Sequence, residues 1–276
     1  MDTTQTASTH TLTVPNIGPV AVTVDERGAG HPVLLLHGGG GPQSVAGFAD
    51  LLSTAAHAHV LTPTHPGFGG TPRPAGLDSI AGLAALYAAL LDRRDQRDVT
   101  VVGNSIGGWI AAELALRAPT RLSSVVLVDA VGIAVPGHPV VDFFSLTLDQ
   151  VAQLSYHDPA AFRVDPAALP AAAQAIMAGN RAALAVYGGT SMADPTLRHR
   201  LAGITVPTLV LWGASDRIVD PAYGHAYAAA VPGARFQVLT ATGHLPQIET
   251  PEQLLRAIWD FAAIHASGRQ SVSHPR

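Results

Sequence analysis

The sequence predicts a mostly parallel, doubly wound α/β sheet of about eight strands, and two observations carry this prediction. Short apolar runs rich in β-branched residues alternate with longer segments in which Leu or Ile recur every three or four residues. The apolar runs are continuous, which is typical of parallel strands covered on both faces. Strands and helices that alternate in this way favour a sheet between two helical layers.

The strands and helices are expected at the following positions. Strands are expected over residues 21–26 and 33–36, which a Gly-rich turn would join as a hairpin. Asp220, directly before a proline, is expected to cap the start of a helix. The remaining strands are expected over residues 59–62, 99–103, 123–129, 206–213 and 235–239, and the helices over 78–94, 109–117, 221–231 and 252–265.

One long segment breaks the alternation. From about residue 131 to 201 no buried-strand run occurs, and prolines separate short helical stretches. An insertion at the carboxyl end of a strand lies over the edge where ligands bind in open α/β sheets. We therefore expect a helical cap over 133–201, inserted after the sixth strand. The core domain would comprise 11–132 and 202–266, and the polar ends, 1–10 and 267–276, would be flexible tails.

Composition narrows the class of protein. With 47% hydrophobic and 13% charged residues, the chain is expected to be a well-buried globular protein. The net charge of -4 offers no electrostatic attraction for nucleic acids or anionic membranes. The chain has no Cys, which excludes disulfides and thiol catalysis, and no paired-histidine motif indicates a metal. We expect a cytoplasmic protein without cofactor or metal that acts on a small molecule; a homo-oligomer remains open.

The most informative motif is Gly103-Asn104-Ser105-Ile106-Gly107, which joins a predicted strand to a predicted helix. Glycines at both ends allow a turn tight enough to hold a serine hydroxyl above the sheet, beside the first N–H groups of the helix. This context predicts that Ser105 is a nucleophile and that the N–H of Ile106 stabilises an oxyanion.

A serine nucleophile needs a base and an orienting acid, and the chain supplies both downstream. His244 lies in a glycine-containing loop after the strand 235–239, and Asp216 lies in the loop after 206–213. Both loops are expected at the same sheet edge as Ser105. Asp129, at the end of the strand 123–129, is the alternative acid.

These motifs resemble those of the α/β-hydrolase superfamily over residues 20–266. The likeness rests on the glycine run after His37, the serine elbow, the two loops named above, and segment 64–71, where His65 replaces a commoner aspartate. The resemblance implies an oxyanion hole formed by the N–H groups of Gly39 and Ile106, with Gly40 as the alternative to Gly39. It also implies a catalytic triad of Ser105, Asp216 and His244.

Within the superfamily, the motifs look most like those of hydrolases that cleave C–C bonds in meta-cleavage products, then enol-lactonases and carboxylesterases. Two features bear on this comparison. Leu245 and its neighbours replace the Trp that usually follows the catalytic His in the C–C hydrolases, and Arg181 is either their carboxylate-binding arginine or a solvated helix residue. The expected substrate contacts are His37, Asn104, Trp109, Phe143, Phe144 and Arg181.

We expect a serine hydrolase that forms an acyl-enzyme with a small or medium carboxylic ester or lactone. C–C bond hydrolysis is the alternative within the same class. A cofactor-free lyase, an acyltransferase or a slow-turnover ligand receptor on the same fold is the alternative of another class. The cap is expected to select the substrate and to contribute little to acyl transfer.

Overall fold

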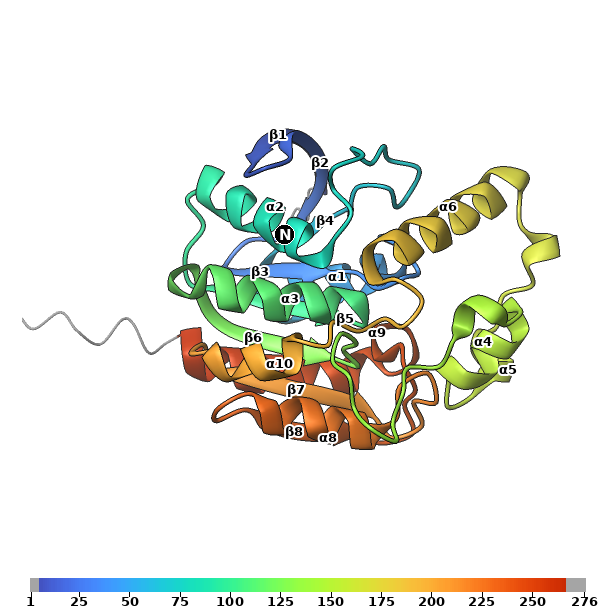
Figure 1. Ribbon diagram of the computed structural model, residues 1–276. Helices are drawn as coiled ribbons and strands as arrows, with labels where there is room; N and C mark the ends of the chain where they lie inside the picture. Colours follow the sequence, from blue (N-terminus) through green and yellow to red (C-terminus); the bar gives the residue numbers. More distant parts are fainter. Residues whose placement is uncertain (1–4, 267–276) are drawn as a thin grey trace, which may run out of the picture.

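The computed structural model describes residues 5–266, which form one eight-stranded sheet in the order β1-β2-β4-β3-β5-β6-β7-β8 (Figure 1). All neighbouring strands from β4 to β8 run parallel, whereas β2 is antiparallel to both of its neighbours. The strands are β1 (Thr6–Val14), β2 (Gly18–Arg27), β3 (His31–Leu36), β4 (Ala58–Pro63), β5 (Val99–Asn104), β6 (Leu122–Val128), β7 (Thr208–Gly213) and β8 (Arg235–Leu239).

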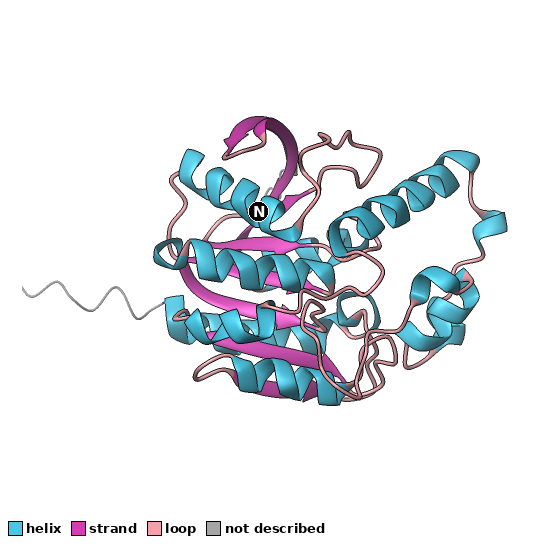
Figure 2. Ribbon diagram, in the orientation of Figure 1, coloured by secondary structure: helices cyan, strands magenta, loops and turns pink. Residues whose placement is uncertain are grey.

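Helices cover both faces of this sheet (Figure 2). Side chains of α1 and α10 form one apolar core with the sheet, and those of α2, α3 and α8 form the other. The predicted doubly wound α/β architecture is therefore confirmed. The α-helices are α1 (Gln43–Ala55), α2 (Ile80–Arg93), α3 (Ile106–Arg117), α4 (Leu148–Ser155), α5 (Pro159–Phe162), α6 (Ala171–Gly188), α7 (Leu197–Arg200), α8 (Pro221–Ala230), α9 (Pro246–Glu249) and α10 (Pro251–Ala266). Four short 3₁₀ helices are η1 (Pro119–Arg121), η2 (Phe143–Ser145), η3 (Pro166–Ala168) and η4 (Leu201–Gly203).

The predicted hairpin between residues 21–26 and 33–36 is wrong. Strand β2 instead pairs with β1 and β4, and β4 separates it from β3. The reason is burial: Val33–Leu36 are all buried, so β3 takes a central position between two parallel neighbours. In contrast, β1 has exposed or half-buried positions over most of its length and occupies the edge.

The predicted N-terminal tail is wrong for residues 6–10, because they form the first half of β1 and pair with β2. Residues 1–4 and the predicted tail 267–276 lie outside the described residues. Helix α1, which follows the glycine run, was not predicted. Asp220 caps α8 as expected, since its side chain accepts a hydrogen bond from the N–H of Tyr223.

The helical insertion follows β6, the sixth strand, as predicted. Helices α4, α5 and α6 project beyond the end of the sheet to the right of Figure 1. None of the helices within residues 5–266 is both long and apolar enough to cross a membrane.

Candidate active site

Ser105 occupies a sharp turn between β5 and α3. Its backbone has φ 57° and ψ −120°, a strained conformation for a residue with a side chain. The turn closes only because two glycines flank it: a Cβ at Gly103 would lie 2.1 Å from the oxygen of Gly107, and one at Gly107 would lie 2.3 Å from the oxygen of Leu36. The half-buried Ser105 faces a cavity that His244 also lines.

His244 forms a buried hydrogen bond with Asp216, with 2.7 Å between Nδ1 and Oδ2. The other carboxylate oxygen of Asp216 accepts N–H bonds from Ile218, at 2.8 Å, and Val219, at 3.1 Å. Three N–H donors therefore surround this carboxylate. Because the carboxylate accepts at Nδ1, the proton lies on Nδ1 and Nε2 of the neutral ring is a free base.

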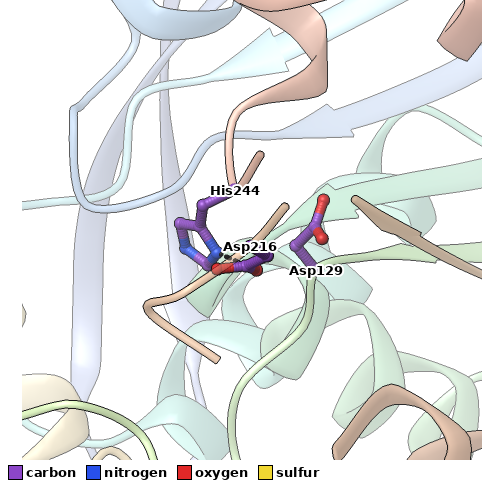
Figure 3. Close-up of side chains that lie close together, drawn as sticks. All are labelled: Asp129, Asp216 and His244. Atoms are coloured by element: carbon purple, nitrogen blue, oxygen red, sulfur yellow. Dashed lines mark hydrogen bonds and ion pairs between the residues drawn. The ribbon is translucent and has the colours of Figure 1, made fainter. Parts of the chain in front are cut away.

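Asp129 lies beside this pair but makes different contacts (Figure 3). Its Oδ1 accepts the N–H of Gly213 at 2.8 Å, while its Oδ2 is buried without a hydrogen-bond partner. Burial, and then the charge of Asp216, raise the pKa of Asp129 well above its usual value. Burial therefore favours the protonated form of Asp129, and Asp216 is the carboxylate that contacts His244.

These three residues are also the one group in the described chain whose ligand atoms lie close enough for a metal ion, within 4.8 Å of one another. Most of these atoms already have hydrogen-bond partners: Oδ1 of Asp129 and both oxygens of Asp216 accept bonds, and Nδ1 of His244 donates one. A cation would have to displace those donors. The arrangement suits proton transfer better than metal binding.

Three backbone N–H groups near Ser105 have no acceptor among the described residues. Gly39 lies in the loop after β3, and its N–H has no acceptor among the described residues; the same holds for Gly40 and for Ile106, the first residue of α3. Gly39 and Gly40 also line the cavity beside Ser105. Such N–H groups at a helix start and a glycine turn can receive a developing negative charge.

The cavity has a volume of about 610 Å³ and lies between the sheet edge and the cap. This volume falls within the range typical of sites for small molecules. Among the described residues that line the cavity, there is no Asp or Glu, and the only Arg is Arg181. The apolar lining consists of Phe143, Leu146, Leu148, Val151, Met177, Ala178, Leu184, Ile218 and Leu245.

Three of the six expected substrate contacts line this cavity: Asn104, Phe143 and Arg181. Asn104 is held by the protein itself, since Nδ2 donates to the carbonyl of His244 at 3.0 Å and Oδ1 accepts from Gln247 at 3.2 Å. One nitrogen of Arg181 binds the carbonyl oxygens of Phe143 and Phe144, at 2.8 and 2.6 Å.

The other three expected contacts, His37, Trp109 and Phe144, do not line the cavity. Trp109 is only 5% exposed and packs against Gly132, where an added Cβ would lie 2.5 Å from the ring. Phe144 lies against Phe143 and below the guanidinium of Arg181.

His37 lies fully buried beneath the glycine loop, stacked on His65 with 3.7 Å between ring centroids. Its Nε2 accepts the N–H of His65, so its Nδ1 carries the proton and donates to the carbonyl of Gly38 at 2.8 Å. Nε2 of His65 in turn donates to the carbonyl of His37 at 3.0 Å, and Nδ1 accepts from Tyr87. Both imidazoles are therefore neutral and support the loop from below.

Sequence reasoning missed Asn180 of α6, which is 5% exposed and lies on the cavity wall. Its side chain contacts the glycine loop and segment 64–71. One signal was available: Asn is an unfavourable residue in the middle of an Ala-rich helix, because its amide competes for backbone hydrogen bonds. A polar residue there indicates a specific partner.

The cap also contacts the loop of His244. The N–H of His244 donates to the carbonyl of Ser155, at the end of α4, over 2.6 Å. Glu249 accepts the N–H groups of Gly243, at 2.6 Å, and Asp158, at 2.9 Å. The loop of His244 and the cap are thus joined by a backbone hydrogen bond and by the carboxylate of Glu249.

One cavity at the carboxyl edge of the sheet is thus lined by Ser105, His244 and the glycine loop, and His244 is bonded to Asp216 behind it. A model described as "Alpha/beta hydrolase family" matches residues 33–257. The chain belongs to the alpha/beta hydrolase family.

Curated relatives include hydrolases of two kinds. The chain is 28% identical to a 2-hydroxy-6-oxo-2,4-heptadienoate hydrolase of Pseudomonas putida, over 89% of this chain and 94% of that protein. It is 26% identical to Lipase 1 of Psychrobacter immobilis, over 82% of this chain and 74% of the lipase. Homology thus places the chain among hydrolases and leaves the bond that is cleaved to be inferred.

Solved structures show the same fold. A thermophilic esterase from Thermogutta terrifontis superposes with a TM-score of 0.74 at 23% identity, covering 94% of this chain and 99% of the esterase. A meta-cleavage product hydrolase from Pseudomonas fluorescens superposes with a TM-score of 0.75 at 19% identity, covering 92% and 97% of the two chains.

Proposed function

We propose that the protein is a serine hydrolase in which Ser105 is the nucleophile, His244 the base and Asp216 the orienting acid. The observation that carries this proposal is the buried 2.7 Å hydrogen bond between His244 and Asp216 on the cavity that Ser105 lines. It leaves Nε2 of His244 available to the serine hydroxyl. Asp216 then stabilises the imidazolium that forms when the hydroxyl proton is transferred.

The reaction would proceed through an acyl-enzyme. Oγ of Ser105 attacks the carbonyl carbon, and His244 takes the proton and returns it to the leaving group. The N–H groups of Gly39 and Ile106 stabilise the tetrahedral oxyanion, with Gly40 as the alternative to Gly39, because they have no acceptor among the described residues. Water activated by His244 then hydrolyses the acyl-enzyme.

We infer that the substrate is a small or medium carboxylic ester or lactone. The mainly apolar lining and the volume of about 610 Å³ support an uncharged acyl or ring group of modest size. A lipase and an esterase among the similar proteins are consistent with this substrate class.

A specific observation also favours C–C bond hydrolysis as a second candidate. Arg181 lines the cavity, and its guanidinium is hydrogen-bonded to backbone carbonyls of residues 143, 144 and 146 rather than to a carboxylate. A cation of this kind suits the carboxylate of a 2-hydroxy-6-oxo-dienoate. Relatives named as hydrolases of such compounds support this candidate.

The first experiment uses a fluorophosphonate probe and Ser105→Ala. We expect the wild-type protein to be labelled at Ser105 and to hydrolyse 4-nitrophenyl butyrate with a burst equal to the enzyme concentration. Ser105→Ala should fold, as judged by circular dichroism, and lose labelling and at least about 10³-fold in kcat. Wild-type activity in this variant, or ligand binding without turnover by the wild type, would overturn the proposal.

A substrate panel separates the two candidates. We expect short-chain aryl esters and lactones to have higher kcat/KM than a 2-hydroxy-6-oxo-dienoate, and Arg181→Ala to change ester KM little. The matched control is Arg163→Ala, an exposed cap arginine that does not line the cavity. A dienoate preference of orders of magnitude, with a KM that rises in Arg181→Ala only, would establish C–C hydrolysis instead.

A further inference from the structure

Helix α6 packs directly on the glycine loop that carries the free N–H groups. A Cβ at Gly39 would lie 2.6 Å from the side chain of Leu184, and one at Gly41 would lie 2.4 Å from Nδ2 of Asn180. Because this loop has no side chains, helix α6 of the cap can approach it closely. The same absence leaves the loop with many accessible conformations, so its orientation needs an outside partner.

Asn180 is that partner. Its Nδ2 donates to the carbonyl of Gly40 over 3.2 Å, although the two residues are 140 positions apart. Its Oδ1 accepts the N–H of Gly69 over 2.8 Å. The two contacts assign the amide without ambiguity, because a carbonyl needs the NH₂ group and an N–H needs the oxygen.

These bonds determine the direction of the carbonyl and N–H groups in the glycine loop. The carbonyl of Gly40 is directed to α6, and the N–H of Gly41 closes a turn onto the carbonyl of Gly38 over 3.1 Å. The N–H groups of Gly39 and Gly40 then have no acceptor in the described part of the chain. Both glycines line the cavity, where the oxyanion would form.

We propose that Asn180 is a positioning residue that holds the oxyanion loop in its working orientation, so that the cap takes part in acyl transfer. This inference rests on the proposed serine-hydrolase function. It differs from the expectation that the cap only selects the substrate. Because α6 also lines the cavity through Met177 and Ala178, substrate contacts with the cap stabilise the same helix that orients the loop.

The test compares three variants with 4-nitrophenyl butyrate as substrate. Asn180→Asp has nearly the same shape and keeps an acceptor for Gly69, but it loses the donor to Gly40. Asn180→Ala removes both bonds and leaves a favourable helix residue. The control is Tyr187→Phe, which removes another bond from α6, that of Tyr187 to the carbonyl of Pro66 at 2.8 Å, without touching the glycine loop.

We expect both Asn180 variants to lose about 10- to 100-fold in kcat, somewhat less than the roughly 10²- to 10³-fold typical of a deleted oxyanion donor. KM should change less than about threefold. The rate of fluorophosphonate labelling should fall in parallel, because that reaction also places charge on an oxygen in the oxyanion hole. Tyr187→Phe should retain kcat, and thermal unfolding should show that all three variants fold.

Other results are equally decisive. A raised KM with unchanged kcat in the Asn180 variants would make Asn180 a substrate contact and overturn the inference. So would an equal kcat loss in Tyr187→Phe, since it would reflect loosening of α6 in general. Failure of wild-type labelling at Ser105 would instead refute the proposed function, so the two failures are distinguishable.

Discussion

At the residue scale, the notable feature is a pair of buried carboxyl groups at the ends of neighbouring parallel strands. Asp129 follows β6 and Asp216 follows β7 by three residues, and each could reach the edge of the sheet. The carboxylate of Asp216 accepts hydrogen bonds from three N–H donors. Asp129 has a single N–H donor and an unpartnered oxygen, and burial raises its pKa.

This difference predicts unequal effects of the same substitution. Asp216→Asn should lower kcat about 10⁴-fold, as neutralising the acid of a triad does elsewhere, because the amide would stabilise the wrong tautomer of His244. Asp129→Asn should cost less than about tenfold, because asparagine is neutral like the protonated acid and keeps an acceptor for Gly213. Steady-state kinetics on one ester measures both, and a reversed ranking would identify Asp129 as the working acid.

At the element scale, the elbow depends on how closely α3 approaches the end of β3. Gly107 lies in the first turn of α3, and its Cα faces the carbonyl oxygen of Leu36. The space is filled by backbone, which cannot move aside as a flexible side chain could. A glycine in the middle of α6, Gly179, is exposed and has no atom within 4 Å of an added Cβ.

Substituting alanine at the two helical glycines should therefore have opposite effects. Gly107→Ala should destabilise the fold by at least about 1–3 kcal/mol through overpacking, and it should displace Ser105. Gly179→Ala should stabilise it by about 0.5–1 kcal/mol, since alanine loses less conformational entropy in a helix. Urea denaturation measures both free energies of unfolding; a stable, active Gly107→Ala variant would contradict the tight-turn explanation.

At the scale of the whole molecule, the stability of the fold depends on pH through buried titratable groups. The buried histidines and Asp129 have opposite effects on this dependence. Burial lowers the pKa of His37 to about 4, and it lowers that of His65 as well. As the pH falls, these two histidines therefore bind protons in the unfolded chain before they do so in the folded protein. The free energy of unfolding thus decreases between about pH 6.5 and pH 4. Asp129 has a raised pKa, so its folded state binds a proton that the unfolded chain releases, and it favours folding at lower pH.

The variants His37→Asn and Asp129→Asn separate these two contributions. His37→Asn should reduce the loss of unfolding free energy between pH 7 and pH 5 by about 2 kcal/mol relative to wild type. Asp129→Asn should enlarge that loss, because it removes the opposing group. The exposed His199 provides the control, as His199→Gln should leave the pH dependence unchanged. Identical pH dependence in all variants would show that the buried groups do not titrate as described.

Part of this molecule could be predicted from the sequence because the relevant signals are local. The central strands are continuous apolar runs, and seven of the eight strands and the helices α2, α3, α8 and α10 lie where periodicity indicated them. The elbow requires glycines at fixed positions around Ser105, so its motif is visible in five residues. Ser105, Asp216 and His244 each follow a strand that ends at the same edge of the sheet, so their proximity could also be predicted.

What the tertiary structure alone decided depends on contacts between residues remote in sequence. Strand β2 pairs with β1 and β4 because more apolar strands occupy the buried centre of the sheet. The turn after β2 carries no signal for this pairing. That Asp216, and not Asp129, is hydrogen-bonded to His244 depends on how their two loops pack after folding. Asn180 reaches Gly40 across 140 residues because α6 packs on a loop without side chains, and close packing of this kind leaves no local pattern.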